Sequence, residues 1–183
     1  MEILTADNLE QAEREVISGR VDLLINARPR PELLAELDFL QPPLHRAPVV
    51  VWVVKGRAFP LQGWEDLQGR RGVRIDTAGG DVEVEGLRLA SHSDFAQALQ
   101  DLLEGKSDYV LFDHSVGLVQ VLRKGWGDRV EVLMPALYSR PRFLALSNNS
   151  VCITPELKAE LAKALQRLES EGSASTIIAH HIQ

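Results

Sequence analysis

Cysteine is nearly absent from this sequence: Cys152 is the only one among 183 residues. An intrachain disulfide needs two thiols and a cysteine-based metal cluster needs several, so neither can form within this chain. A single cysteine suits the cytoplasm and the periplasm equally well. Redox chemistry therefore does not identify the compartment.

Long apolar runs and an excess of basic charge are also missing. No stretch approaches the ~20 apolar residues that span a bilayer. The start, MEILTADNLEQAEREV, lacks the basic flank and apolar core of a signal peptide. The 26 acidic and 20 basic side chains leave a net charge of -6. Such a surface repels phosphates, and Arg28, Arg30 and Arg46 are too sparse to reverse this. We therefore expect no nucleic-acid partner.

Segments with helical periodicity alternate along the chain with strand-like segments. Helices are predicted between a capping box at Asp7 and Gly19, and over about 32–36, 63–69, 94–105, 113–123 and 155–171, with a last one from about 173. Strands are predicted at 21–25, 49–54, 72–75, 87–90, 109–112, 130–133 and 143–146. This alternation predicts an α/β fold with mostly parallel strand pairing.

Two phrases of the sequence echo one another. GRVD precedes the apolar LLI at 23–25, and GKSD precedes YVL at 109–111. Each phrase places a glycine at a predicted helix end and an aspartate before a buried strand. Ordinary helix-to-strand loop chemistry explains this pattern, and so does a chain built from two similar lobes.

Six phrases, in order along nearly the whole chain, carry a family resemblance: SGRVDLLI, ELDFLQPP, VVVWVVKG, WEDLQGRRGVRIDTAGG, ALQDLLEGKSDYVLFD and ITPELKAELAKALQRLESEGSASTII. Together they resemble the bacterial extracellular solute-binding proteins of family 3, which are periplasmic amino-acid receptors of ABC importers. The resemblance implies an α/β, two-lobed periplasmic-binding-protein-like fold (type II), with the ligand between lobes that close on a hinge. It implies no cofactor.

The resemblance also implies domain boundaries. Lobe 1 would consist of residues 1–49 plus 144–183 and lobe 2 of residues 50–143, with crossover strands near 49–54 and 142–147. The first strand and helix of the family have no counterpart before Ile3, so either the chain is a fragment or lobe 1 is expected to lack them. That omission would expose a sheet edge, which a partner chain or a homodimer would cover.

The family's binding residues map only partly onto this chain. Asp113 matches the aspartate that holds the ligand's ammonium group, although aspartate at this place also caps a helix well. The family arginine falls at Leu33, which cannot bind a carboxylate. Arg28 and Arg30, in the preceding loop, are the candidates to replace it, and the alternative is that both are solvated loop arginines.

The anion-binding loop of the second lobe is altered as well. The family's Gly-Thr-Thr aligns with Asp76, Thr77 and Ala78, so a carboxylate side chain occupies a position at which an anion should dock. Thr77 is retained. The segment GGDVEVEG that follows is poor helix material, so the helix after the loop is expected to be shortened or lost.

The resemblance implies a non-enzymatic small-solute-binding protein of the ABC-transporter substrate-binding type, and these departures predict that its amino-acid cleft is divergent or vestigial. Its ligand would be a small polar solute, its partner a membrane transporter or sensor, and its location, by resemblance, the periplasm. One alternative is an enzyme on the same fold resembling cyclohexadienyl dehydratase, for which Asp113, Asp76 and Glu36 are the candidate acids. Others are a sensor or effector-binding domain and a pure interaction protein. His180 and His181 are adjacent on a predicted helix and point apart, so no metal site is predicted.

Overall fold

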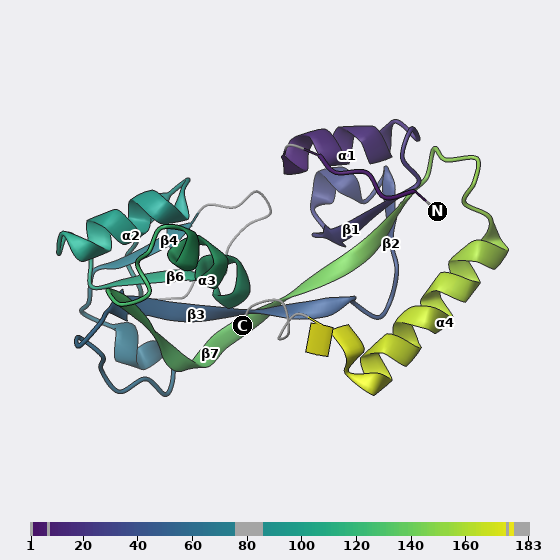
Figure 1. Ribbon diagram of the computed structural model, residues 1–183. Coiled ribbons are helices and arrows are strands. Elements are labelled where there is room, and N and C mark those ends of the chain that lie inside the picture. Colours follow the sequence, from purple (N-terminus) through teal and green to yellow (C-terminus); the bar gives the residue numbers. More distant parts are fainter. Residues whose placement is uncertain (1, 7, 76–85, 175, 178–183) are drawn as a thin grey trace. The chain divides into compact units, whose positions relative to one another are not determined.

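The computed structural model describes residues 2–6, 8–75, 86–174 and 176–177 (Figure 1). The chain divides into two compact units: unit 1 runs up to Arg46 and resumes at Pro141, and unit 2 is Ala47–Arg140. The sequence predicts boundaries after residues 49 and 143. The structure divides the chain after Arg46 and Arg140. That the units act as lobes of a receptor stays a prediction. In the part of the chain that the structure describes, every helix is too short or too polar to cross a lipid bilayer.

Unit 1 is built around the last part of one long strand, β7 (Val130–Ser147). The other elements of unit 1 are α1 (Leu9–Ile17), β1 (Leu23–Ala27), a 3-10 helix η1 (Pro31–Leu33), β2 (Leu37–Phe39) and α4 (Pro155–Glu171). Both β1 and β2 pair antiparallel with β7, and Ala145 faces Leu24 in one strand and Phe39 in the other. Ala145 packs in a core cluster with Val16 of α1, whereas its neighbours Leu144 and Leu146 pack with Leu165 of α4. Successive residues of a strand point to opposite faces, so α1 and α4 cover opposite sides of the strand.

Unit 2 is a mixed sheet in the order β7-β3-β6-β4-β5. Its elements are β3 (His45–Val54), a 3-10 helix η2 (Trp64–Leu67), β4 (Gly72–Ile75), β5 (Leu89–His92), α2 (Phe95–Leu103), β6 (Tyr109–Asp113) and α3 (His114–Arg123). In β3, Val50 and Trp52 join the core cluster that contains residues of α2 and α3, whereas Val51 joins the cluster that contains Leu67 of η2. Burial on both faces explains why residues 49–54 of β3 form a continuous apolar run.

Three local expectations are wrong, each for a physical reason. Helix α1 is capped by Asn8, whose Oδ1 accepts a hydrogen bond from the Gln11 N–H at 2.9 Å, and Asp7 lies outside the described residues. The predicted strands at 130–133 and 143–146 are parts of the single 18-residue β7. Pro135 and Pro141 lie within this strand. Pro135 lies in the unit 2 part, where β7 is the outer strand and an unpaired proline is tolerated.

The third wrong expectation concerns pairing. Among the strand pairings that the structure describes, β4 runs parallel to β5 and β6, whereas β3 pairs antiparallel with β6, and β1 and β2 pair antiparallel with β7. Strands β3 and β7 each pass from one unit to the other along the chain. Their direction is therefore not set by the helical crossovers that force neighbouring strands to run parallel.

The two glycine–aspartate phrases have similar local structures. Gly19 and Gly105 both follow a helix C-cap with φ +76, in the left-handed region where glycine is favoured. The main-chain carbonyl of Asp22 accepts a hydrogen bond from Ser147 N–H at 2.9 Å. The Asp108 carboxylate accepts from the Arg71 backbone N–H at 2.7 Å. Each aspartate thus ties the beginning of a strand to a neighbouring segment, as ordinary loop chemistry predicts.

We expect the Asp108→Asn variant to lose part of the acid sensitivity of unit 2. The hydrogen bond from the Arg71 guanidinium lowers the pKa of Asp108 below its ordinary value. A lowered folded-state pKa contributes stability that is present above the unfolded value of ~3.9 and is lost as the pH falls through the folded value. Urea unfolding at pH 7, 5 and 3 should therefore show a shallower decline for the variant. The control is Asp128→Asn, because that exposed carboxylate lies 3.7 Å from Lys55. Equal declines for wild type and Asp108→Asn would contradict the expectation.

Candidate functional site

Asp113 ends a strand that is buried throughout and begins a helix. All five residues of β6 are buried, and Asp113 is 4% exposed. Its Oδ1 accepts a hydrogen bond from the Val116 N–H at 3.1 Å, so the side chain caps α3. A carboxylate has about four acceptor positions. Capping is therefore compatible with a second role for Asp113 in binding a cation.

Packed aromatic side chains contact the beginning of α3. The His114 ring stacks on Trp52 with centroids 6.3 Å apart, and Trp52 meets Phe95 edge-on at 5.4 Å. Gly117 lets α3 approach closely, because a Cβ built there would lie 2.5 Å from Cζ2 of Trp52. Trp52 is 1% exposed. Asp113 is thus held at the end of a helix whose position is set by packing.

Arg28 and Arg30 lie in the loop between β1 and η1 of unit 1, and the structure distinguishes them. Arg28 is half-buried. Arg30 is only 9% exposed, so its interpretation as a solvated loop arginine is wrong. The direct ligand role of either arginine stays a prediction. Asp113 belongs to unit 2, so each unit holds part of the predicted set.

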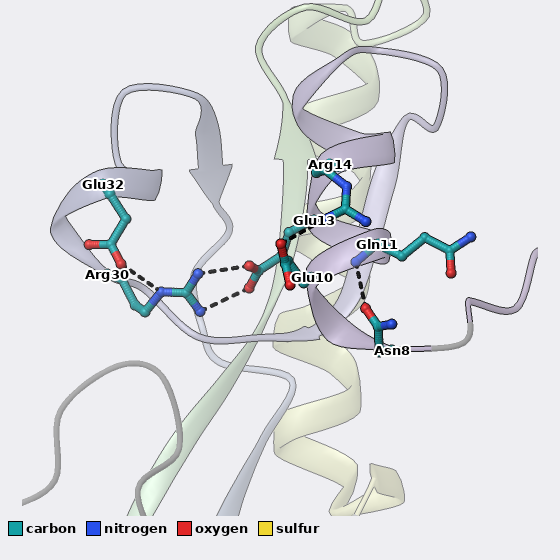
Figure 2. A network of polar contacts seen from close by, with 7 residues as sticks. All are labelled: Asn8, Glu10, Gln11, Glu13, Arg14, Arg30 and Glu32. Atoms are coloured by element: carbon teal, nitrogen blue, oxygen red, sulfur yellow. Dashed lines mark hydrogen bonds and ion pairs between the residues drawn. The ribbon is translucent and has the colours of Figure 1, made fainter. Parts of the chain in front are cut away.

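The Arg30 guanidinium is surrounded by carboxylates (Figure 2). Its Nη1 and Nη2 donate to the two carboxylate oxygens of Glu13 at 3.0 and 2.7 Å, and its Nε donates to Glu32 at 2.9 Å. The hydrogen bonds to Glu13 raise the pKa of Arg30 above its ordinary value, and Glu32 adds to this. A bidentate arginine–carboxylate pair is strong and directional. The loop is therefore bound to α1 through the side chains of Arg30 and Glu13. These residues are 17 positions apart, so no local sequence pattern reveals that they pair.

Glu13 is the residue that the sequence interpretation missed. It is 7% exposed although it is charged, and it lies on α1 beside buried Val16. The available signal was its place in the apolar stripe, four residues after Leu9 and three before Val16. A carboxylate in such a stripe needs a buried partner, and Arg30 supplies it.

The remaining predicted residues are not placed. Asp76, Thr77 and Ala78 lie outside the described residues, as do His180 and His181. Within 2–6, 8–75, 86–174 and 176–177, no group of three His, Cys, Asp or Glu side chains could hold a metal ion.

Comparison with solved structures identifies the fold. The chain is similar to an ancestral cationic amino-acid solute-binding protein, with TM-score 0.69, 18% identity, and coverage of 98% of this chain and 77% of that one. It is similar to the ligand-binding core of GluR0 in complex with L-glutamate, with TM-score 0.69, 16% identity, and coverage of 100% and 81%. A third is the periplasmic VFT2 domain of BvgS from Bordetella pertussis, with TM-score 0.68, 17% identity, and coverage of 98% and 75%. No protein-family model matches the chain, and no match is found among curated proteins.

At these identities the likeness is one of fold. The chain has the α/β fold of two-lobed periplasmic-binding-protein-like domains, as the six phrases predicted. It spans about three quarters of the length of these solved chains. The first is described as a solute-binding protein and the second as a ligand-binding core.

Proposed function

We propose that this protein is a non-enzymatic binding protein for a small, polar, amino-acid-like solute, of the ABC-transporter substrate-binding type. The observation that carries the proposal is the likeness of nearly the whole chain to proteins whose descriptions name cationic amino acids, L-arginine and L-glutamate. The neighbours' descriptions support binding rather than catalysis.

In this proposal Asp113 holds the cationic group of the solute. Ligands of open α/β sheets bind beyond the carboxyl ends of strands, and Asp113 is the last residue of β6. A buried carboxylate forms charge-assisted hydrogen bonds with ammonium or guanidinium groups. Arg28 would face a solute carboxylate, and Thr77 with Asp76 and Ala78 would complete the site. The replaced arginine at Leu33 and the altered loop support a cleft that diverges from the ordinary amino-acid pattern.

We place the protein in the periplasm, with a membrane transporter or sensor as its partner. One similar structure is the substrate-binding protein of an amino-acid ABC transporter from Streptococcus pneumoniae, bound to L-arginine, with TM-score 0.65, 19% identity, and coverage of 98% and 76%. The BvgS domain is described as periplasmic. The homodimer expected from an open sheet edge is less favoured. Among the described strands of unit 1, β1 and β2 are outer strands that pair with β7; β1 is five residues long and irregular between Leu24 and Ala27, and β2 is three residues long. Short, bulged edges resist strand pairing.

A thermal-shift screen with a charge-removing variant tests this proposal. A solute at about 100 times its Kd should raise the Tm of the wild type by roughly 5–10 °C. The panel is L-arginine, L-lysine, L-glutamine, L-glutamate and putrescine. Asp113→Asn keeps a capping side chain and removes the charge, so it should fold and lose the shift with cationic solutes.

The matched control is Asp94→Asn. Asp94 caps α2 by accepting a hydrogen bond from the Ala96 N–H at 3.1 Å, as Asp113 caps α3. This variant should keep the full shift. A flat wild-type response across the panel would overturn the amino-acid proposal. An undiminished shift in Asp113→Asn would overturn the assignment of Asp113.

A further inference from the structure

We propose that Arg30 is a positioning residue: its ion pair with Glu13 holds the loop of residues 28–33 on α1 and so fixes Arg28, while Arg30 itself does not bind solute. This inference deepens the proposed function and, for the ligand role of Arg28, rests on it. The holding of the loop is a property of unit 1 alone.

The ion pair and a buried leucine together anchor the loop. Arg30 precedes η1 in an extended conformation, with φ -137 and ψ 149. Its guanidinium reaches α1 at Glu13, and Leu33, at the other end of η1, is 4% exposed in the core cluster that contains Val16. Two points of attachment to one helix leave η1 little freedom to shift against α1.

Two prolines transmit this anchoring to Arg28. Pro29 and Pro31 flank Arg30, and each pyrrolidine ring holds its own φ near -65°. A proline also restricts the residue that precedes it, which here means Arg28 and Arg30. Only Pro29 separates Arg30 from Arg28, so fixing Arg30 restricts the directions in which the Arg28 side chain can leave the loop.

The charges around Arg30 argue against a direct ligand role. All three guanidinium nitrogens already donate to carboxylates, two to Glu13 and one to Glu32. To bind a solute carboxylate through Nη1 and Nη2, Arg30 would have to leave Glu13 buried and unpaired, which is costly. To bind one through Nε and a neighbouring Nη, it would have to leave Glu32.

Hydrogen exchange without any solute tests the holding of the loop. In Glu13→Gln and in Arg30→Gln, the amides of Arg28, Arg30 and residues 32–34 should exchange about tenfold faster, because the local opening becomes easier. The control is Glu10→Gln, which removes the exposed ion pair of Glu10 with Arg14 on the same helix (Figure 2). It should leave these amides unchanged. Unchanged protection in both Glu13→Gln and Arg30→Gln would overturn the proposal.

Calorimetric titration with L-arginine and L-glutamate separates positioning from direct binding. If Arg30 positions Arg28, Glu13→Gln should weaken binding of the solute that the wild type takes by at least about fivefold, since preorganisation is lost. If Arg30 binds the solute, releasing it from Glu13 should leave the affinity unchanged or increase it, and that result would overturn the proposal. If the wild type binds neither these two solutes nor the other members of the thermal-shift panel, the amino-acid proposal fails, while hydrogen exchange still decides whether Glu13 holds the loop.

Discussion

Replacing Glu13 with leucine is expected to lower the free energy of unfolding by about 3 kcal/mol, because it leaves the Arg30 charge buried without its bidentate partner. The two side chains are 9% and 10% exposed, so water cannot take over the lost hydrogen bonds without rearrangement. Glu32, the remaining partner, is 65% exposed and bonds only Nε. Urea unfolding at neutral pH measures the loss.

The double variant Glu13→Leu/Arg30→Met identifies the origin of this loss. Replacing both members of a buried pair by apolar side chains of similar size is often neutral or stabilising, so the double variant should return to within about 1 kcal/mol of the wild type. Glu10→Leu is the control, because Glu10 is 82% exposed and should change stability little. A double variant as unstable as Glu13→Leu would contradict this account. A full return would mean that the pair is retained for the geometry of the loop rather than for stability.

The second large effect is expected from Gly117→Ala. The added Cβ would lie 2.5 Å and 2.9 Å from two atoms of the Trp52 ring and 3.2 Å from Cζ of Phe95. Both rings are fully buried and stacked against other aromatics, so neither can give way freely. Overpacking of this kind costs about 1–3 kcal/mol, which outweighs the better helix propensity of alanine. We expect a net loss of about 1 kcal/mol in urea unfolding.

Gly127→Ala is the matched control for this prediction. A Cβ at Gly127 would meet its nearest atom, Cδ2 of Leu122, at 4.0 Å, so the substitution should be nearly neutral. Adding Trp52→Phe to Gly117→Ala removes part of the obstructing ring, and the two substitutions should cost less together than the sum of their separate effects. Strict additivity would show that the contact is not the cause. Because α3 begins next to Asp113, Gly117→Ala should also weaken any solute binding that depends on Asp113.

Much of the fold could be predicted from the sequence, because the signals that end helices are local. The predicted strand at 72–75 is β4 (Gly72–Ile75), and the predicted helix at 155–171 is α4, which begins at a Thr154 cap and ends before Gly172 with φ +64. Each signal acts over about one turn of helix. Where two local signals compete, the structure is needed, and Asn8 rather than Asp7 caps α1.

The candidate site was less predictable, because its residues come from distant parts of the chain. Asp113 could be identified by its place after a buried strand, and the structure adds that it is buried and caps α3. The role of Arg30 could not be identified in the same way. Two loop arginines separated by one proline have equivalent surroundings in sequence.

The sequence alone therefore determined the elements, their α/β order and the resemblance of the chain to two-lobed binding proteins, since periodicity, caps and apolar strands are properties of neighbouring residues. Only the tertiary structure decided which charges are buried together, which strands pair, and that β7 continues through its prolines. Those outcomes depend on contacts such as Arg30 with Glu13, 17 residues apart, whose free energy comes from desolvation and packing that no local pattern records.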